Sequence, residues 1–141
     1  MIYGVGIDLV DVERVARLLD RHGARARLRI FTDDEWRRCQ ASGSEVLCLA
    51  ARLAAKEAFS KALGTGIAQG VRWRDIEVTR AAGSRPTLRL HGEARRLLDE
   101  RCPGARLHVS LTHTATSSAA VVIIEGAALP DPSIGVDPTA A

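Results

Sequence analysis

The chain has 141 residues, of which 46% are hydrophobic, 26% charged and 4% aromatic, and its net charge is +3. This composition is typical of one water-soluble globular domain, and it excludes a membrane-spanning protein because the longest apolar run is far too short to cross a bilayer. The mild positive charge favours an anionic partner, but nucleic acid is disfavoured because aromatic residues are few and no Lys/Arg run is present to follow a backbone.

Hydrophobic side chains alternate along residues 2–9, which predicts a strand with one apolar face and one face stripped of bulk. Gly4, Gly6 and Asp8 lie on the second face. Glycine inside a strand marks close approach by another backbone or by a ligand, and both possibilities remain open here. Gly4 and Gly6 do not form a dinucleotide-binding fingerprint, because Leu9 occupies the position of its third glycine and both glycines lie inside the strand.

Residues 11–22 are predicted to form a helix capped by Asp11. Arginines recur along it at spacings of three and four: Arg14, Arg17, Arg21 and, if the helix continues, Arg25. One interpretation of this stripe is an ordinary solvated face. The other is a cationic ridge for docking an acidic protein surface, because the stripe carries charges of one sign only.

A capping box at residues 32–35 predicts a short helix through about Cys39. A long helix follows from about residue 45, with Gly64 as its left-handed terminator. Counting 100° per residue puts Leu49, Leu53 and Glu57 within about 60° of one line. Glu57 is therefore expected on the apolar stripe, where a carboxylate needs a cation, a metal or a proton.

Asp8 and Glu57 together suit a hard cation, since Mg²⁺ takes one or two protein carboxylates and completes its octahedron with waters and phosphate oxygens. Lys61, one turn after Glu57, can neutralise a phosphate. Residues 64–66 (GTG) then offer free backbone N–H groups and a hydroxyl. The structural alternative is an i,i+4 pair of Glu57 with Lys61, and Asp8 capping a turn. Two carboxylates in such unusual places favour the metal site.

The remaining elements are a hairpin of two strands at residues 75–80 and 85–90, a helix at 93–101, a strand at 107–112 and an apolar central strand at 118–124. This order predicts an α+β domain with a largely antiparallel sheet. Residues 126–141, rich in Ala, Pro and Asp, are predicted to be a disordered tail, which leaves residues 1–125 as the domain.

His113 follows the strand at residues 107–112. A lone histidine is more often a structural residue than a catalyst. Ser110 and Thr112 point to the opposite face of the strand, so a Ser–His pair is not expected.

Three cysteines, Cys39, Cys48 and Cys102, are odd in number and lack the close spacing of metal ligands. We therefore expect free thiols in a reducing cytoplasm. No charged start followed by an apolar block indicates a secretory signal, which agrees with a cytoplasmic location.

Four blocks, in this order, resemble the holo-[acyl-carrier-protein] synthase family, the small trimeric type of 4′-phosphopantetheinyl transferase: GVGIDLVDVER (4–14), FTDDE (31–35), RLAAKEAFSKALGTG (52–66) and VSLTH (109–113). The resemblance covers about residues 1–125. It implies a fold in which a largely antiparallel sheet packs with a long central helix. It also implies Mg²⁺-dependent transfer of phosphopantetheine from coenzyme A to a serine of an apo acyl carrier protein, with release of 3′,5′-ADP.

The resemblance also implies roles for single residues. Asp8 and Glu57 match the family's Mg²⁺ ligands, and Lys61 matches the lysine that contacts the pyrophosphate, so these three are the expected catalytic residues. Positions near the nucleotide and its phosphates are matched by Arg52, Gly64, Thr65, Gly66 and His113. The basic first helix that receives the acidic carrier protein is matched by Arg14 and Arg21, with Arg17 on the same stripe. Family members form homotrimers with active sites shared between subunits.

One departure from the family pattern is Thr112, which replaces the second serine of Ser-x-Ser-His. The hydroxyl is kept, but the added methyl can crowd a pocket. An alternative function is therefore a binding protein that docks carrier proteins or coenzyme A without transfer. A nucleic-acid binder, supported only by the positive charge, is the third reading.

Overall fold

The computed structural model describes residues 1–127; the predicted tail at 126–141 lies almost wholly outside the described residues. The elements are β1 (Ile2–Asp11), α1 (Val12–Ile30), α2 (Asp33–Gln40), α3 (Glu45–Leu63), the 3-10 turn η1 (Trp73–Asp75), β2 (Ile76–Thr79), β3 (Thr87–Leu90), α4 (Gly92–Arg101), β4 (Arg106–His113) and β5 (Ser117–Glu125). Their order confirms the predicted α+β class.

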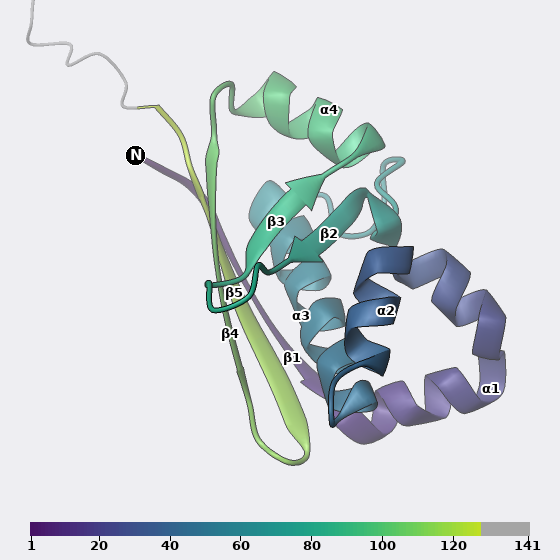
Figure 1. Ribbon diagram of the computed structural model, residues 1–141. Helices are drawn as coiled ribbons and strands as arrows, with labels where there is room; N and C mark the ends of the chain where they lie inside the picture. Colours follow the sequence, from purple (N-terminus) through teal and green to yellow (C-terminus); the bar gives the residue numbers. More distant parts are fainter. Residues whose placement is uncertain (128–141) are drawn as a thin grey trace, which may run out of the picture.

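An antiparallel sheet of order β1-β5-β4 forms one layer, and β2 and β3 pair as a separate hairpin. The predicted central strand β5 does lie in the middle. In its register Asp8 is opposite Ala120 and His113 is opposite Ser118. Figure 1 shows α3 running between the sheet and the hairpin.

Close approach of α3 to β1 explains the two glycines of the strand. A Cβ at Gly4 would collide with the carbonyl oxygen of Ala62, and one at Gly6 with that of Ala58. Of the two possibilities that the sequence left open for these glycines, a nearby backbone or a ligand, the structure shows a nearby backbone.

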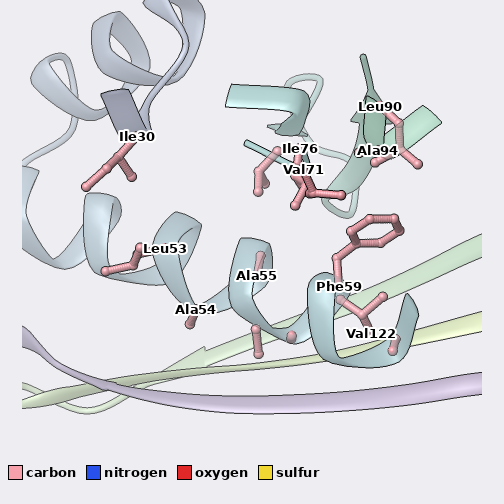
Figure 2. Close-up of a cluster of buried hydrophobic side chains, with 14 of the residues drawn as sticks. Ile30, Leu53, Ala54, Ala55, Phe59, Val71, Ile76, Leu90, Ala94 and Val122 are labelled. Carbon is pink, nitrogen blue, oxygen red and sulfur yellow. The ribbon is translucent and has the colours of Figure 1, made fainter. Parts of the chain in front are cut away.

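Burial of α3 extends around most of its circumference, because it is packed on both sides. Ala54, Ala55 and Ala58 are fully buried. Figure 2 shows Leu53 and Phe59 on the side of α3 that faces away from the sheet. The helix is therefore buried on more sides than the single apolar stripe that was predicted. Glu57, expected on that stripe, is only half-buried.

The charged residue that α3 buries completely is Lys56, which the sequence did not single out. Its ammonium group donates to Glu35 Oε1 at 2.7 Å and to the Trp73 carbonyl at 3.2 Å. Glu35 Oε2 also accepts the Val78 N–H at 2.9 Å. These hydrogen bonds connect α2, η1 and β2 to α3, and they satisfy the buried charges of Lys56 and Glu35.

Both predicted helix starts are found, with one extension. Thr32 and Glu35 form the expected capping box of α2. Asp11 precedes α1 as predicted, but its side chain makes no capping hydrogen bond. The helix also continues beyond residue 22, through a kink at Gly23 (φ 42°), because glycine tolerates this conformation.

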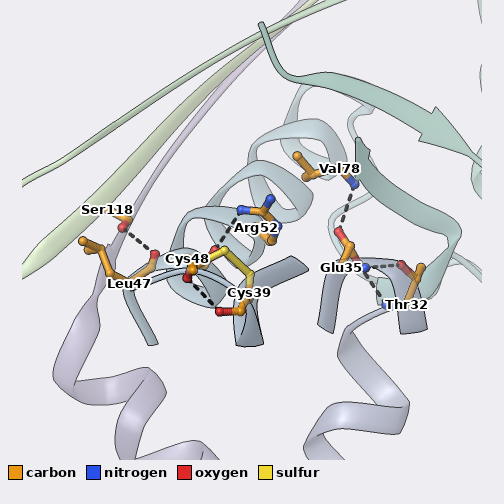
Figure 3. Close-up of a disulfide and its surroundings, with 9 residues drawn as sticks. Thr32, Glu35, Cys39, Leu47, Cys48, Arg52, Val78 and Ser118 are labelled. Atoms are coloured by element: carbon orange, nitrogen blue, oxygen red, sulfur yellow. Dashed lines mark hydrogen bonds between the residues drawn. A yellow bond between two sulfur atoms is a disulfide. The ribbon is translucent and has the colours of Figure 1, made fainter. Parts of the chain in front are cut away.

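The expectation of three free thiols is wrong. Cys39 at the end of α2 and Cys48 at the start of α3 form a disulfide, with their Cα atoms 5.3 Å apart (Figure 3). The tight connection at residues 41–44 turns α3 back against α2, which brings together two cysteines whose spacing carried no signal. Only Cys102 is free among the described residues.

The apolar face of β1 points away from α3. Val5, Ile7 and Leu9 are 56%, 67% and 69% exposed. In the register of the sheet, Ile123 lies opposite Val5 and Val121 opposite Ile7, so β5 extends the same face. An apolar surface of this kind marks an interaction site.

No described helix is both long and apolar enough to cross a membrane.

Candidate functional site

Asp8 and Lys61 meet where β1 crosses α3. Asp8 is 8% exposed, because it lies on the glycine face of the strand. The Lys61 ammonium group donates to Asp8 Oδ1 at 3.0 Å and to the Ile7 carbonyl at 3.1 Å. Among the described residues Lys61 makes no ion pair with Glu57, so the local i,i+4 alternative is not what the fold uses.

Glu57 completes a group that we call the Asp8 cluster (Asp8, Glu57 and Lys61). Burial, a hydrogen bond with Asp8 and the negative charge of Asp8 raise the pKa of Glu57 to about 7. The charges of Arg14 and Lys61 act in the opposite direction. The two carboxyl groups are therefore close enough that they resist being ionised together.

The donor set fits a hard divalent cation. Asp8 Oδ2 is buried and has no hydrogen-bond partner among the described residues. A buried carboxylate oxygen of this kind requires a cation, or the proton of a neutral Glu57. No group of three or more His, Cys, Asp or Glu side chains gathers within residues 1–127. Two carboxylates leave the remaining positions to water and substrate oxygens, which is the pattern of Mg²⁺.

An open hollow of about 710 Å³ adjoins Glu57 and follows α1. Its polar and aromatic lining consists of Arg14, His22, Arg25, Arg29, Glu57 and Trp73. Arg17 and Arg21 line a smaller hollow beside it, together with Arg14. The arginine stripe therefore leads to the Asp8 cluster. Arg14 lines both hollows. Sequence reasoning placed Arg14 only on the ridge and missed its closeness to Glu57; its position just after the strand that carries Asp8 was the available signal.

The backbone N–H groups of residues 64–66 are not free, contrary to the prediction. All three donate to the Ser60 carbonyl, at 3.1 Å each. The Thr65 hydroxyl donates to the Gly66 carbonyl at 2.6 Å. Gly64 ends α3 in the left-handed conformation, as predicted, and this tight closure uses the donors of the loop.

Arg52 lies on a different side of α3 from the Asp8 cluster and is 7% exposed. Its Nη1 donates to the Cys48 carbonyl at 3.2 Å. Burial lowers the pKa of Arg52, Glu35 opposes this, and the charges of Arg38 and Arg80 lower it further. Repulsion between these positive charges would weaken if an anion were bound.

His113 is exposed at the end of β4, with Thr112 and Ser110 on the opposite face of the strand as predicted. Within residues 1–127 no hydrogen bond or ion pair joins His113, Arg52 or residues 64–66 to the Asp8 cluster. One chain therefore assembles the carboxylates, Lys61 and the arginine stripe, while the other predicted site residues lie elsewhere on the chain.

Known proteins resemble this chain closely. Residues 4–116 match the model of the 4′-phosphopantetheinyl transferase superfamily. The holo-[acyl-carrier-protein] synthase of Methylobacterium radiotolerans is 52% identical over 128 residues, which cover 89% of this chain and 94% of the relative. Among solved structures, the holo-[acyl-carrier-protein] synthase of Neisseria meningitidis is 37% identical with a TM-score of 0.79, covering 89% of this chain and 99% of that one. The Bacillus anthracis synthase in complex with CoA (3′,5′-ADP) is 32% identical with a TM-score of 0.73, covering 90% and 99%.

Proposed function

This chain belongs to the 4′-phosphopantetheinyl transferase superfamily, and we propose that it transfers the 4′-phosphopantetheine arm of coenzyme A to a serine of an apo acyl carrier protein, releasing 3′,5′-ADP. The observation that carries the proposal is the Asp8 cluster, with its unpartnered buried carboxylate oxygen, beside an arginine-lined hollow. Relatives named holo-[acyl-carrier-protein] synthase support it over nearly their whole length. The transferase domain in this proposal is residues 1–125, located in the cytoplasm.

Asp8 and Glu57 are the residues that would hold Mg²⁺, since both are carboxylates in a partly buried place. When bound, Mg²⁺ neutralises charge on the diphosphate of coenzyme A and on the leaving 3′,5′-ADP. Phosphoryl transfer of this kind depends mainly on positioning and charge neutralisation, so the enzyme needs no nucleophile of its own.

Lys61 is oriented by its two hydrogen bonds to Asp8 and to the Ile7 carbonyl. An ammonium group has three donors, so one remains for a phosphate oxygen of the donor substrate. Because the side chain is 55% exposed, that donor is accessible to a ligand.

The attacking serine must lose its proton, and the two carboxylates are the candidate bases. Glu57 has a pKa of about 7 without metal, because it is half-buried beside Asp8. A base of this strength suits proton transfer near neutral pH. Asp8 remains the second candidate where Glu57 contacts the cation directly.

The carrier protein docks on α1 in this proposal. Arg14, Arg17 and Arg21 are exposed along one stripe and present charges complementary to an acidic surface. Such charges act mostly on encounter rate and register. The stripe leads to Glu57, which is where the carrier's serine has to arrive.

We further propose a homotrimer with shared active sites. The exposed apolar face of Val5, Ile7 and Leu9 needs a cover in water, and further copies of the chain can supply it. Arg52 and His113, which one chain does not bring to the Asp8 cluster, are then available to complete the site of a neighbouring subunit.

The deciding experiment is mass spectrometry of an apo carrier protein incubated with the enzyme, coenzyme A and Mg²⁺. We expect the mass of the phosphopantetheine arm to be added to the carrier serine. No mass change across fatty-acid and polyketide carriers would refute the transferase. Calorimetric binding of coenzyme A without turnover would instead select the non-catalytic binding protein.

A further inference from the structure

A disulfide connects the end of α2 to the first turn of α3, between Cys39 and Cys48 (Figure 3). Cys39 is fully buried and Cys48 is half-buried, so one sulfur of the pair lies nearer to solvent. The third cysteine, Cys102, is buried and free. In a cytoplasmic protein, a disulfide of this kind is usually transient and redox-sensing.

Arginines flank both ends of this bond. Arg38 precedes Cys39 in the chain, and Arg52 lies one turn after Cys48 and donates to the Cys48 carbonyl at 3.2 Å. Burial lowers the pKa of Arg52, Glu35 opposes this, and the positive charge of Arg38 lowers it further. The disulfide therefore holds together two segments that carry mutually repelling cations.

We infer that Cys39 and Cys48 form a reversible redox modification site, and that the disulfide increases the affinity of the protein for anionic coenzyme A by keeping Arg38 close to Arg52. This inference rests on the proposed function, in which Arg52 helps to complete the coenzyme A site of a neighbouring subunit. When the bond is broken, repulsion moves the end of α2 away from α3, and the positive potential around Arg52 falls.

The change is local, because the other end of α2 is fixed independently. Glu35 is buried in its ion pair with Lys56 and also accepts the Val78 N–H, so the first turn of α2 remains attached to α3 and β2 without the disulfide. Only the last turn and the connection at residues 41–44 are released. Reduction is therefore expected to alter binding and not to unfold the protein.

The chemistry is thiol–disulfide exchange with a dithiol reductant. One thiolate of the dithiol attacks Sγ of Cys48, the bond to Sγ of Cys39 breaks, and Cys39 leaves as a thiolate that takes up a proton. The second thiol of the reductant then displaces Cys48 and closes its own disulfide. Two electrons pass from the dithiol to the protein disulfide, and the two protons of the dithiol end on the sulfurs of Cys39 and Cys48, leaving two protein thiols and one oxidised dithiol.

The test compares the full chain after treatment with the thiol oxidant diamide or with reduced dithiothreitol, followed by removal of the reagent. Thiol titration after denaturation should count one free thiol in the oxidised protein, Cys102, and three in the reduced protein. We expect KM for coenzyme A to be about fivefold higher in the reduced form, while KM for the carrier protein stays unchanged. Calorimetry with coenzyme A alone should show the same shift in Kd.

Matched variants separate this effect from general damage. Cys39→Ser should behave as the reduced protein under both treatments, whereas Cys102→Ser should respond as the wild type does. If Cys39→Ser does not fold, the wild-type comparison decides alone. Equal KM and Kd in the two thiol-counted forms, three thiols after oxidation, or loss of the response in Cys102→Ser would each overturn the inference. If the carrier is modified by neither form while Kd still shifts, the transferase proposal fails and the redox site stands.

Discussion

The Lys61 ammonium group, on α3, donates a 3.0 Å hydrogen bond to the carboxylate of Asp8, on β1, which lies 53 residues earlier in the chain. Within residues 1–127 Glu57 makes no ion pair, and it lies beside the carboxyl group of Asp8. Two carboxyl groups therefore share one ammonium group, and a bound cation would neutralise the remaining negative charge.

Removing either carboxylate should abolish most turnover. We expect Asp8→Asn and Glu57→Gln each to lower kcat by about 100-fold or more, because each keeps its shape but loses the charge that would hold Mg²⁺. The measurement is initial rate of carrier modification at saturating coenzyme A. Asp34→Asn, an exposed carboxylate on α2, is the control and should keep full activity. Normal rates in both site variants would contradict the metal assignment.

Stability without metal should fall as the pH rises toward neutral. The pKa of Glu57 is raised from 4.5 to about 7, so its contribution to stability is fully present below pH 4.5 and is lost as pH rises through about 7. We expect the Tm of the EDTA-treated protein to fall by a few degrees across this window, a small change because the side chain is only half-buried. Mg²⁺ should raise the Tm more above this pH window than below it. The Glu57→Gln protein should lack this part of the pH dependence. Identical Tm curves for the two proteins would show that Glu57 does not cause the fall in stability.

Adding one methyl group at Gly6 should be strongly destabilising. Gly6→Ala would force the Ala58 carbonyl of α3 away from β1, which we expect to cost about 3 kcal/mol or more of unfolding free energy in urea. Gly43→Ala is the matched control, since a Cβ there meets nothing within 4 Å. Equal midpoints for the two variants would show that α3 does not lie against this strand.

A charge on the exposed face of β1 should break the assembly. Ile7→Glu places a carboxylate in the centre of this face, where covering it would bury an unpaired charge. Light scattering should report a trimer for the wild type and a smaller species for the variant, with activity falling in parallel. Leu28→Glu alters another exposed apolar residue, on α1, and should leave the mass unchanged. A monomeric wild type would remove the trimer proposal.

The buried pair of Lys56 and Glu35 should show strong coupling. Lys56→Met leaves the Glu35 carboxylate buried without its cation, and we expect a loss of about 3–5 kcal/mol. The double variant with Glu35→Gln should recover part of this loss, because no unpaired charge remains. Arg37→Met breaks an exposed pair with Asp34 and should cost less than about 1 kcal/mol. Additive losses in the double-mutant cycle would show that the two side chains do not interact.

Local features of this protein were predictable because they depend on neighbours in the chain. The capping box at Thr32 and Glu35, the left-handed end of α3 at Gly64 and the central strand β5 follow from dihedral preferences and hydrophobic periodicity. The unusual positions of Asp8 and Glu57 were likewise visible, since a charge on a face that should be buried stands out in the pattern.

Partner choice could not be predicted, because it depends on how distant elements pack. Periodicity placed Lys61 one turn from Glu57, yet the approach of β1 gave it Asp8. Lys56 carries no local sign of burial, and becomes buried only because a hairpin covers the side of α3 that faces away from the sheet. The spacing of Cys39 and Cys48 matches no motif, and the turn between two helices joins them.

Short blocks of residues were enough to predict the order of helices and strands, the unusual carboxylates and the family. Which face of β1 is exposed, which charges pair and which thiols are bonded became known only from the packing. Burial and pairing energies arise between segments far apart in the chain, where packing sets the distances.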